Sequence, residues 1–392
     1  MWRWAVSVVA PEKRLYQQCT VTVMDTTDPD ISFDATGASM YVASFEQNYA
    51  PTLTRAQSGQ RADELGQLVE KIKADGRGKP YDVVIGISGG VDSTYLTLSA
   101  VRLGLRPLCV HFDSGWNSEA AVDNIHNLVT SLGLDLYTQV VDWREMRDLQ
   151  LAYLRSGIAN ADTPTDHAFG YVAYHQAQKY GIKHILSGSN LVSESILPTA
   201  WGYTSADSKL LRSIHRRFGS VKLKTYPLMS SFTRTLWYPY ARGIETHALL
   251  NYLPYHYEQA KAEIAKEVGW RDYGGKHYES VFTRWFQGYY LPQRFHFDKR
   301  LAHYSSLILA KEMSRDDALA LLKTPNYPEE LRIQDHEFMA KKLGISLAEL
   351  DAIVAAPPRD YSDYPNSAAS TKRLFAFTAN VGAVLRKLRV LR

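Results

Sequence analysis

The stretch VVIGISGGVDSTYL, residues 83–96, places the strongest limit on what this chain can fold into. Its apolar start is typical of a buried strand, the glycine pair predicts a tight turn, and the remainder predicts a helix from about residue 92. Without side chains at Gly89 and Gly90, main-chain amides can approach an anion at the helix N-terminus, and Ser88 and Ser93 can add hydroxyl donors. The stretch therefore predicts a phosphate-binding loop.

Apolar strands and amphipathic helices alternate along the chain from residue 61 to residue 188. We expect strands at 82–87, 106–112, 134–141 and 183–188, and helices at 61–76, 92–103, 118–133, 143–156 and 166–180. Strands that are nearly all apolar belong to parallel sheets covered by helices on both faces. The expected fold class is α/β, a doubly wound parallel sheet that binds its ligand at the carboxyl ends of its strands.

The pattern changes beyond about residue 235, where aromatic-rich and mostly helical segments begin. Helices are predicted within 257–270, 298–323 and 329–344. A chain of 392 residues is long enough for two or three domains. We expect an N-terminal module over 1–60, a nucleotide-binding domain over 61–235 and a helical substrate-binding domain over 236–392.

Composition argues against several classes of protein. A count of 45 Lys and Arg against 41 Asp and Glu falls short of the basic surface that binds a polyanion, so we expect no nucleic acid partner. Two cysteines, Cys19 and Cys109, cannot form a disulfide framework and fit a reducing, cytoplasmic compartment. No apolar window is long enough to span a membrane. We interpret the opening MWRWAVSVVA as a peripheral strand or a ragged start, with a signal peptide as the alternative.

The glycine turn reads SGGVDS and lacks the lysine of a Walker A loop. It resembles the SGGxDS loop of the ATP pyrophosphatases, which holds the pyrophosphate that leaves when ATP is cleaved between its α and β phosphates. The alternative is a plain turn in which Asp92 and Ser93 only cap the helix. The resemblance implies ATP, with Mg²⁺, as ligand, Asp92 as a catalytic residue, and a loop formed by Ser88, Gly89, Gly90, Val91, Asp92 and Ser93.

Two further strand ends carry polar residues that could reach the same ligand. HFDSGWNS places His111, Asp113 and Ser114 after the second strand. SGSNLVSES, which is similar to a strand-end segment of NAD synthetase, places Ser187, Gly188, Ser189, Asn190 and Glu194 after the fourth. Glu194 is a candidate Mg²⁺ ligand or general base. The alternative is that Asn190 and Glu194 only serve the N-terminus of the next helix.

Residues 273–319, beginning YGGKHYESVF, resemble the N-acetyl sugar amidotransferases of bacterial surface-polysaccharide, or O-antigen, biosynthesis. MDTTDPDISFDATG, TPTDHAF at 163–169 and LKTYPLM at 223–229 extend the resemblance over about residues 14–330. It implies an enzyme that converts the N-acetyl group of a nucleotide-activated sugar into an acetamidino group at the expense of ATP. The additional catalytic candidates are Lys276, His277 and Glu279, and the substrate-binding candidates are Asp166, His167, Arg284, Lys299, Arg300 and His303. The alternative for each is a solvated charge or a satisfied polar residue.

The implied chemistry explains these residue types. An amide carbonyl is a poor electrophile toward ammonia, so its oxygen must first become a leaving group. Transfer of AMP to that oxygen would give an adenylate, while pyrophosphate departs into the 88–93 loop. Charge then builds on phosphates, and fixed cations serve better than a covalent nucleophile.

The resemblance also predicts what the chain lacks. Members of the family commonly carry two CxxC pairs, and these positions here hold Tyr16, Cys19, Ser39 and Val42. One thiolate cannot hold structural zinc, so none is expected. The sequence shows no N-terminal catalytic cysteine and no surroundings typical of a glutaminase catalytic triad, and Cys109 lies in a predicted strand. Ammonia is therefore expected from a partner glutaminase with a channelling, synthase-like subunit, similar to the two subunits of imidazole glycerol phosphate synthase.

Two other hypotheses share the ATP loop. A tRNA-modifying enzyme of the thiolation or lysidine type would be expected to show reactive cysteines and a basic surface. A nucleotide-binding scaffold could have lost catalysis together with its cysteines, although the intact loop argues against this. The sequence leaves the identity of the sugar and of its nucleotide open.

Overall fold

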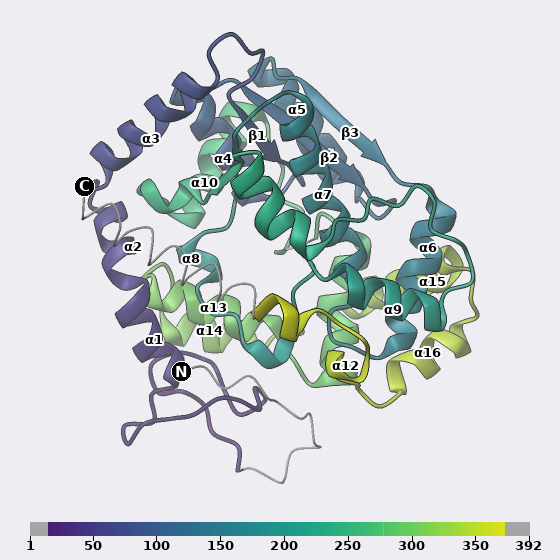
Figure 1. The fold of residues 1–392 in the computed structure, drawn as a ribbon. Coiled ribbons are helices and arrows are strands. Elements are labelled where there is room, and N and C mark those ends of the chain that lie inside the picture. Colours follow the sequence, from purple (N-terminus) through teal and green to yellow (C-terminus); the bar gives the residue numbers. More distant parts are fainter. Residues whose placement is uncertain (1–14, 277, 373–392) are drawn as a thin grey trace.

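A five-stranded parallel sheet forms the centre of the computed structural model, which describes residues 15–276 and 278–372 (Figure 1). The strand order is β3-β2-β1-β4-β5, and every neighbouring pair is parallel. The strands are β1 Val83–Gly86, β2 Pro107–Asp113, β3 Leu136–Val140, β4 His184–Leu186 and β5 Glu245–His247. The expected α/β class with a doubly wound parallel sheet is confirmed.

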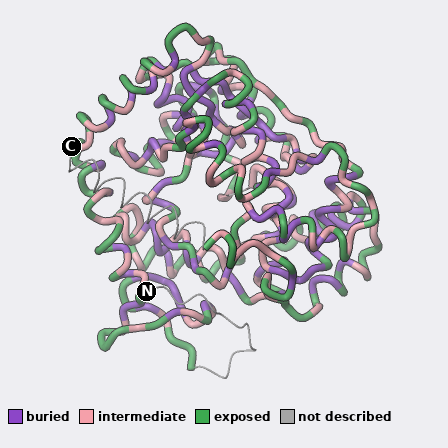
Figure 2. The backbone as a smooth tube through the Cα atoms, in the orientation of Figure 1, coloured by how far each residue is buried: buried purple, intermediate pink, exposed green. Residues whose placement is uncertain are grey.

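The two faces of the sheet bury separate sets of apolar side chains. Along β1, Val84 packs into one core with α6 and α7, whereas Val83 and Ile85 pack into another with α3, α4, α5 and α10. This alternation follows from the two-residue period of a strand. Buried residues accordingly run through the middle of the molecule (Figure 2). The helices of these layers are α3 Ala62–Asp75, α4 Val91–Arg102, α5 Glu119–Leu132, α6 Trp143–Ser156, α7 Thr163–Lys179, α8 Leu191–Glu194, α9 Ser208–Phe218 and α10 Tyr257–Val268.

Three features of the sheet layers differ from expectation. The strand β5 comes from residues 245–247, for which no strand was predicted because they lie in the part of the chain expected to be mostly helical, and it pairs with β4 at the edge of the sheet. The helix α10 packs against α4 and α5 rather than among C-terminal helices. The segment 298–323 forms two helices because the chain turns at Lys311, with φ of 63°, and restarts at Ser314. The expected three-domain division stays a prediction.

The C-terminal helices share a core with the α6 and α7 side of the sheet. The buried aromatic residues Phe282, Trp285 and Tyr290 belong to the same cluster as Tyr153 of α6. Arg294 donates to the Leu154 carbonyl at 3.0 Å and joins the two parts. The elements are α11 Val281–Trp285, a π-helical segment Phe286–Tyr290, α12 Leu291–Phe295, α13 Lys299–Leu309, α14 Arg315–Leu322, α15 Glu329–Leu343 and α16 Leu347–Ala355.

The N-terminal module consists of a loop followed by α1 Met40–Asn48 and α2 Ala50–Gln57. Cys19 is fully buried, and its sulfur accepts N–H groups from Thr22 at 3.3 Å and Ser39 at 3.2 Å. Val42 packs against it, whereas Tyr16 is exposed. Three of the four positions of the family's cysteine pattern therefore lie together around a single thiol. The opening segment, residues 1–14, lies outside the described residues.

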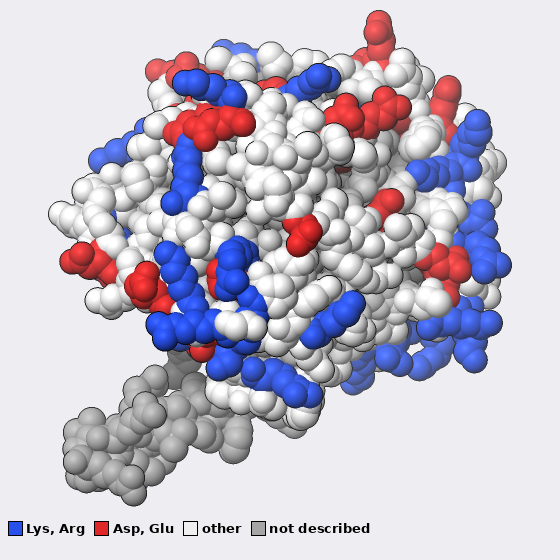
Figure 3. Space-filling view, turned by 90° about the horizontal axis from the view of Figure 1, so that it is seen from above, with Lys and Arg blue, Asp and Glu red and all other residues white. Residues whose placement is uncertain are grey.

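The face seen from above carries both signs of charge, with large uncharged areas between the charged side chains (Figure 3). Lys and Arg gather along its lower and right edges, whereas Asp and Glu lie mostly in its upper and left parts. That distribution agrees with the formal net charge of +4. In the described part of the chain, no helix has the length and apolarity needed to cross a bilayer.

Candidate functional site

The loop between β1 and α4 has the geometry of an anion-binding turn. Gly89 adopts φ of +82°, and a Cβ atom there would lie 2.6 Å from the carbonyl oxygen of Ala121 on α5. Only glycine fits this position without displacing α5. The first N–H groups of α4 have no intrahelical acceptor and carry the positive end of the helix dipole. The loop therefore offers main-chain donors to a phosphate at the carboxyl end of β1.

The two serines of the loop are bonded within it. The Ser88 hydroxyl accepts the N–H of Gly90 at 3.3 Å, and the Ser93 hydroxyl donates to the Gly90 carbonyl at 3.2 Å. Gly90 is the N-cap of α4, and no side chain caps it. The alternative in which Asp92 and Ser93 only cap the helix is therefore not what the structure shows.

Asp92 instead joins the loop to two other segments. Its Oδ1 accepts a hydrogen bond from Asn190 Nδ2 at 3.0 Å and one from the Tyr255 hydroxyl at 2.5 Å. Burial, together with the Asp92 carboxylate, raises the pKa of Tyr255 far above its ordinary value, so Tyr255 remains a donor. The carboxylate of Asp92 is thus held at the ligand side of the loop by two donors.

The end of β4 meets the loop at Gly188 and Asn190. The side-chain oxygen of Asn190 accepts the N–H of Ser193 at 2.8 Å and caps α8, so the capping alternative for Asn190 is confirmed. The same amide also reaches Asp92, so the residue serves the loop as well. Ser187 and Ser189 bond each other at 3.1 Å beside it. Glu194, the last residue of α8, is exposed.

Residues 270–281 pass over the loop from the far end of the chain. Trp270 donates its indole N–H to the Gly89 carbonyl at 2.9 Å, and Asn124 of α5 exchanges two hydrogen bonds with Arg271. Further along, the N–H of Ser118 donates to the Glu279 carbonyl at 2.9 Å. This covering segment, as we call residues 270–276 and 278–281, is therefore fastened to the sheet layer at both of its ends.

The middle of the covering segment brings charged side chains to the strand ends. The ammonium of Lys276 donates to the Ser193 hydroxyl at 3.1 Å and lies 3.4 Å from Glu194. A Cβ atom on Gly90 would lie 3.7 Å from Oε1 of Glu279 and 3.4 Å from the Tyr273 hydroxyl. The predicted catalytic residues Asp92, Glu194, Lys276 and Glu279 thus gather around one loop. His277 lies outside the described residues.

The end of β2 supports the loop from its other side. The ring of His111 contacts the Ile87 carbonyl through Nδ1 at 2.9 Å and Asn117 Nδ2 through Nε2 at 3.0 Å. A carbonyl accepts and an amide nitrogen donates, so this pairing has Nδ1 donating to Ile87 and Nε2 accepting from Asn117. Asn117 also donates to Asp113 at 3.2 Å. His111 and Asp113 therefore hold the strand end in shape, and Ser114 is buried beside them.

Of the six predicted substrate-binding residues, His303 lies beside the site, and Asp166 and Lys299 lie near each other. His303 contacts the Ser193 carbonyl at 3.2 Å, beside Lys276. Asp166 and Lys299 are electrostatic neighbours. Burial and the nearby Asp162 raise the pKa of Asp166 to about 8, and burial lowers the pKa of Lys299 to about 8. The Asp166 side chain still contacts solvent, which limits the size of its shift but not its direction.

The structure gives the other three residues partners within the fold. His167 contacts the Ser205 carbonyl at 2.7 Å and accepts the N–H of Met229 at 3.0 Å, so both ring nitrogens are used. Arg284 forms a two-pronged ion pair with buried Asp335 at 2.7 and 2.8 Å. Arg300 binds Asp298 and two carbonyl oxygens. For these three the alternative of a satisfied polar residue describes the structure better than substrate binding.

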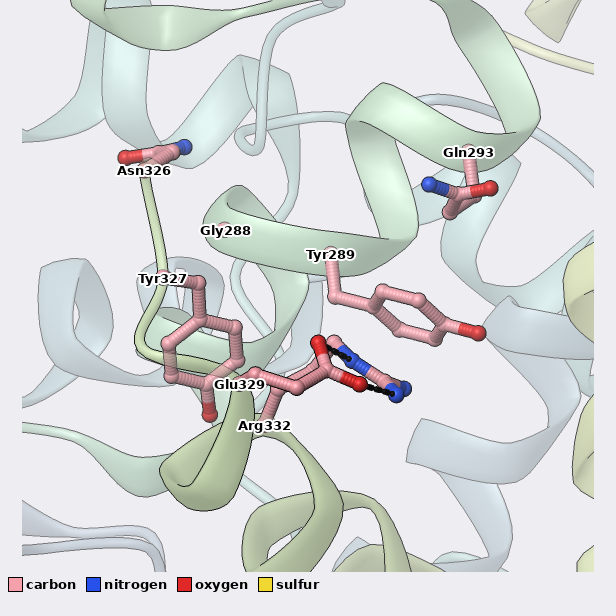
Figure 4. Close-up of a pocket in the computed structure, with 7 residues that line it drawn as sticks. All are labelled: Gly288, Tyr289, Gln293, Asn326, Tyr327, Glu329 and Arg332. Carbon is pink, nitrogen blue, oxygen red and sulfur yellow. Dashed lines mark hydrogen bonds and ion pairs between the residues drawn. The ribbon is translucent and has the colours of Figure 1, made fainter. Parts of the chain in front are cut away.

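A pocket that sequence analysis missed lies among the C-terminal helices (Figure 4). Arg332 pairs with Glu329 at its edge and lies 4.9 Å from the centre of the Tyr289 ring. Its wall touches the covering segment, since the Tyr278 hydroxyl donates to the Asn326 carbonyl at 3.2 Å. The only available signal was the clustering of aromatic residues near 289. The lining residues are Gly288, Tyr289, Gln293, Asn326, Tyr327, Glu329 and Arg332.

The carboxylates at the loop offer the oxygen ligands that Mg²⁺ prefers. Asp92, Glu194 and Glu279 come from three different segments around the phosphate-binding turn. Within the described ranges they do not form a group of three donors close enough to hold one ion. They therefore fit an ion that arrives with a phosphate ligand and keeps waters of its own, as Mg²⁺ commonly does.

Comparison with known proteins finds a match to one family and similarity to two other proteins. Residues 279–378 match the model of the C-terminal domain of WbpG-like LPS biosynthesis proteins. The chain is 29% identical over 110 residues to the glutamine-hydrolysing GMP synthase of Pyrobaculum aerophilum, a match that covers 28% of this chain and only 20% of that protein. It is also similar to the solved NMN synthetase of Francisella tularensis, at 17% identity and a TM-score of 0.27, over 47% of this chain and 71% of the other. The match to the WbpG-like C-terminal domain begins at Glu279, inside the covering segment.

Proposed function

We propose that this chain, an LPS-related member of the PP-loop superfamily, is an ATP-dependent amidotransferase that converts the N-acetyl group of a nucleotide-activated sugar into an acetamidino group. One observation carries the proposal. The covering segment, where the WbpG-like region begins, brings Glu279 to the loop that suits a pyrophosphate group and Lys276 to the neighbouring helix α8. Phosphate binding and the family-specific part of the chain therefore meet at one place.

In the proposed reaction the sugar's amide oxygen attacks the α phosphorus of ATP. The bond between that phosphorus and the bridging oxygen breaks, and pyrophosphate leaves into the Ser88–Ser93 loop, where main-chain N–H groups stabilise its charge. Ammonia then adds to the activated carbon, one proton is lost, and AMP departs with the former amide oxygen. Mg²⁺, when bound beside Asp92 and Glu194, would neutralise phosphate charge.

The charged residues around the loop suit distinct parts of this sequence. Lys276 places a cation beside the loop, where negative charge develops on the α phosphate. Glu279 lies close to Gly90 and is the carboxylate best placed to accept the proton that ammonia loses. Tyr273, whose pKa burial and Glu279 raise strongly, stays protonated and can donate to a phosphate oxygen.

The cysteines support an external source of ammonia. Cys109 is fully buried in β2, and burial raises the pKa of its thiol to about 12, which makes it an inert thiol. Cys19 is also buried. Neither suits a glutaminase nucleophile, and neither suits a thiolating enzyme. We propose that a glutaminase and a channelling, synthase-like subunit supply ammonia, and that free ammonium replaces them in vitro.

The proposal is tested by incubating the purified chain with ATP, Mg²⁺, ammonium and candidate UDP- and CMP-linked N-acetyl sugars. Exchange of oxygen for NH should give a product lighter by about one mass unit, formed together with equal amounts of AMP and pyrophosphate. A reaction mixture without sugar is the control. Release of AMP that never depends on a sugar would reject the proposal, and RNA bound to the purified protein would favour the tRNA-modifying alternative.

A further inference from the structure

A second cluster of chemically capable side chains lies on the sheet away from the ATP loop. His184 begins β4 and is paired in register with Glu245, the first residue of β5. His247 follows two positions later, so its side chain lies on the same face as Glu245. These three side chains form the one group of potential metal ligands found among the described residues.

The distances within this cluster suit a tetrahedral ion. Nδ1 of His184 lies 3.0 Å from Nε2 of His247, which lies 3.6 Å from Oε2 of Glu245. Ligand atoms about 2.1 Å from a tetrahedral zinc ion are separated by about 3.4 Å. Small side-chain rotations would therefore bring all three atoms to one ion. His184 is fully buried, whereas Glu245 is about half exposed, so the cluster opens toward solvent.

A carboxylate behind the cluster orients its buried histidine. Asp75, the last residue of α3, lies 2.9 Å from Nε2 of His184. With the Nε2 proton donated to this carboxylate, Nδ1 presents its lone pair to the cluster, where it lies within hydrogen-bond distance of His247 Nε2. Metal-binding histidines usually have their second nitrogen held in this way.

A lysine occupies the position that a cation would take. The ammonium of Lys71 lies 2.8 and 2.7 Å from the two carboxylate oxygens of Glu245. The Lys71 side chain is half exposed, so it can move into solvent when an ion binds. The ammonium and a metal ion would therefore compete for the same carboxylate.

We propose that His184, His247 and Glu245 form a binding site for a transition-metal ion of the zinc type. Two imidazoles and one carboxylate favour zinc, cobalt or nickel over Mg²⁺ or Ca²⁺, which prefer all-oxygen sites. Three protein ligands leave a fourth position for water. The ion would join the three-residue edge strand β5 to β4. The expectation that the chain holds no structural zinc considered only the N-terminal cysteines.

The test uses the full chain, free of any histidine tag and stripped with chelator. Isothermal titration with zinc should give one site per chain. His247→Ala should abolish binding and Glu245→Gln should weaken it by tenfold or more, while both variants keep the circular dichroism spectrum of the wild type. His126→Ala, at an exposed histidine on α5, is the matched control and should bind like the wild type.

The variant Lys71→Ala gives the sharpest readout, because it removes the competing ammonium and should bind zinc more tightly than the wild type. Cobalt bound to the wild type should show the visible absorption of a tetrahedral site, and His247→Ala should lose it. Failure of the wild type to bind zinc, or binding that His247→Ala leaves unchanged, would overturn the assignment. None of these measurements requires sugar or ATP, so their outcome is independent of the proposed enzyme activity.

Discussion

The ammonium of Lys276 lies 3.4 Å from the carboxylate of Glu194, although 82 positions separate the two residues in the chain. Glu194 ends the short helix after β4, and Lys276 belongs to the covering segment. This contact is one of several that join the sheet layer to the covering segment near the phosphate-binding loop.

Lys276→Ala should separate ATP binding from sugar activation. If Lys276 stabilises charge on the α phosphate, its loss should leave ATP affinity nearly unchanged and reduce sugar-dependent AMP formation by ~10²-fold or more. Calorimetry with ATP and an AMP assay on the same variant measure the two effects. Lys266→Ala, at an exposed lysine of α10, is the control. Normal turnover would reject the role, and lost ATP binding would assign Lys276 to the nucleotide.

Ser93→Ala or Asp92→Ala should abolish pyrophosphate release while the fold remains intact. The Ser93 side chain bonds within the loop, so its loss should cost little stability. Asp92 also accepts hydrogen bonds from Asn190 and buried Tyr255, so Asp92→Ala should lower the free energy of unfolding somewhat, and Ser93→Ala is the cleaner variant. Pyrophosphate release and circular dichroism check the two parts of this expectation. Ser213→Ala, on α9 and distant from α4 in Figure 1, should behave as the wild type. Wild-type pyrophosphate release from either loop variant would contradict the assignment of the loop.

Arg284→Ala should destabilise the protein rather than weaken sugar binding. Its partner Asp335 is buried, and removing one member of a buried pair typically costs about 3–5 kcal/mol in the free energy of unfolding. Denaturant titration measures this loss. Arg144→Ala breaks an exposed pair with Asp142 and should leave stability almost unchanged. A stable Arg284→Ala protein with a raised KM for the sugar would restore Arg284 as a substrate contact.

The pH dependence of stability tests the surroundings of Asp166, which include Asp162, Lys299 and Arg234. Its pKa is raised above the ordinary value of 3.8, so above pH 3.8 the folded state binds more protons than the unfolded state. The contribution of this group to the free energy of unfolding therefore falls as the pH rises above 3.8. The side chain introduced by Asp166→Asn cannot titrate, so the melting temperature of this variant should rise relative to that of the wild type as the pH increases. Asp123→Asn, at an exposed position of α5, is the control, and the difference between its melting temperature and that of the wild type should not change with pH. A pH-independent difference for Asp166→Asn would contradict the raised pKa.

Local patterns were sufficient to predict most of the fold. The helix predicted at 143–156 is α6 with the same bounds, and the loop at 88–93 follows a strand as expected. Such elements are encoded by runs of neighbouring residues, whose periodicity is visible in one sequence. The strand β5 was not predicted, because three residues are too few to show the two-residue hydrophobic period of a strand. It is a strand only because β4 offers it hydrogen bonds.

The site could be predicted only where a residue's position followed from a strand end or a glycine turn. Asp92, Asn190 and Lys276 gather as expected because all three lie beside such features. The partners of Arg284 and His167 could not be predicted, since Asp335 and Met229 are distant in sequence and lie near them only after folding. The cluster of His184 and His247 was not predicted for the same reason: the two histidines are distant in sequence and show no spacing typical of a metal site.

The transfer of one oxygen atom tests the central claim most directly. If the amide oxygen of the sugar attacks the α phosphorus, a substrate labelled with oxygen-18 in its acetyl carbonyl should yield AMP that carries the label. Mass spectrometry of the released AMP and of the sugar product measures where the label goes. We predict labelled AMP, unlabelled pyrophosphate and an acetamidino sugar without the label. Unlabelled AMP, with oxygen-18 retained in the sugar, would contradict adenylation of the amide and with it the proposed function.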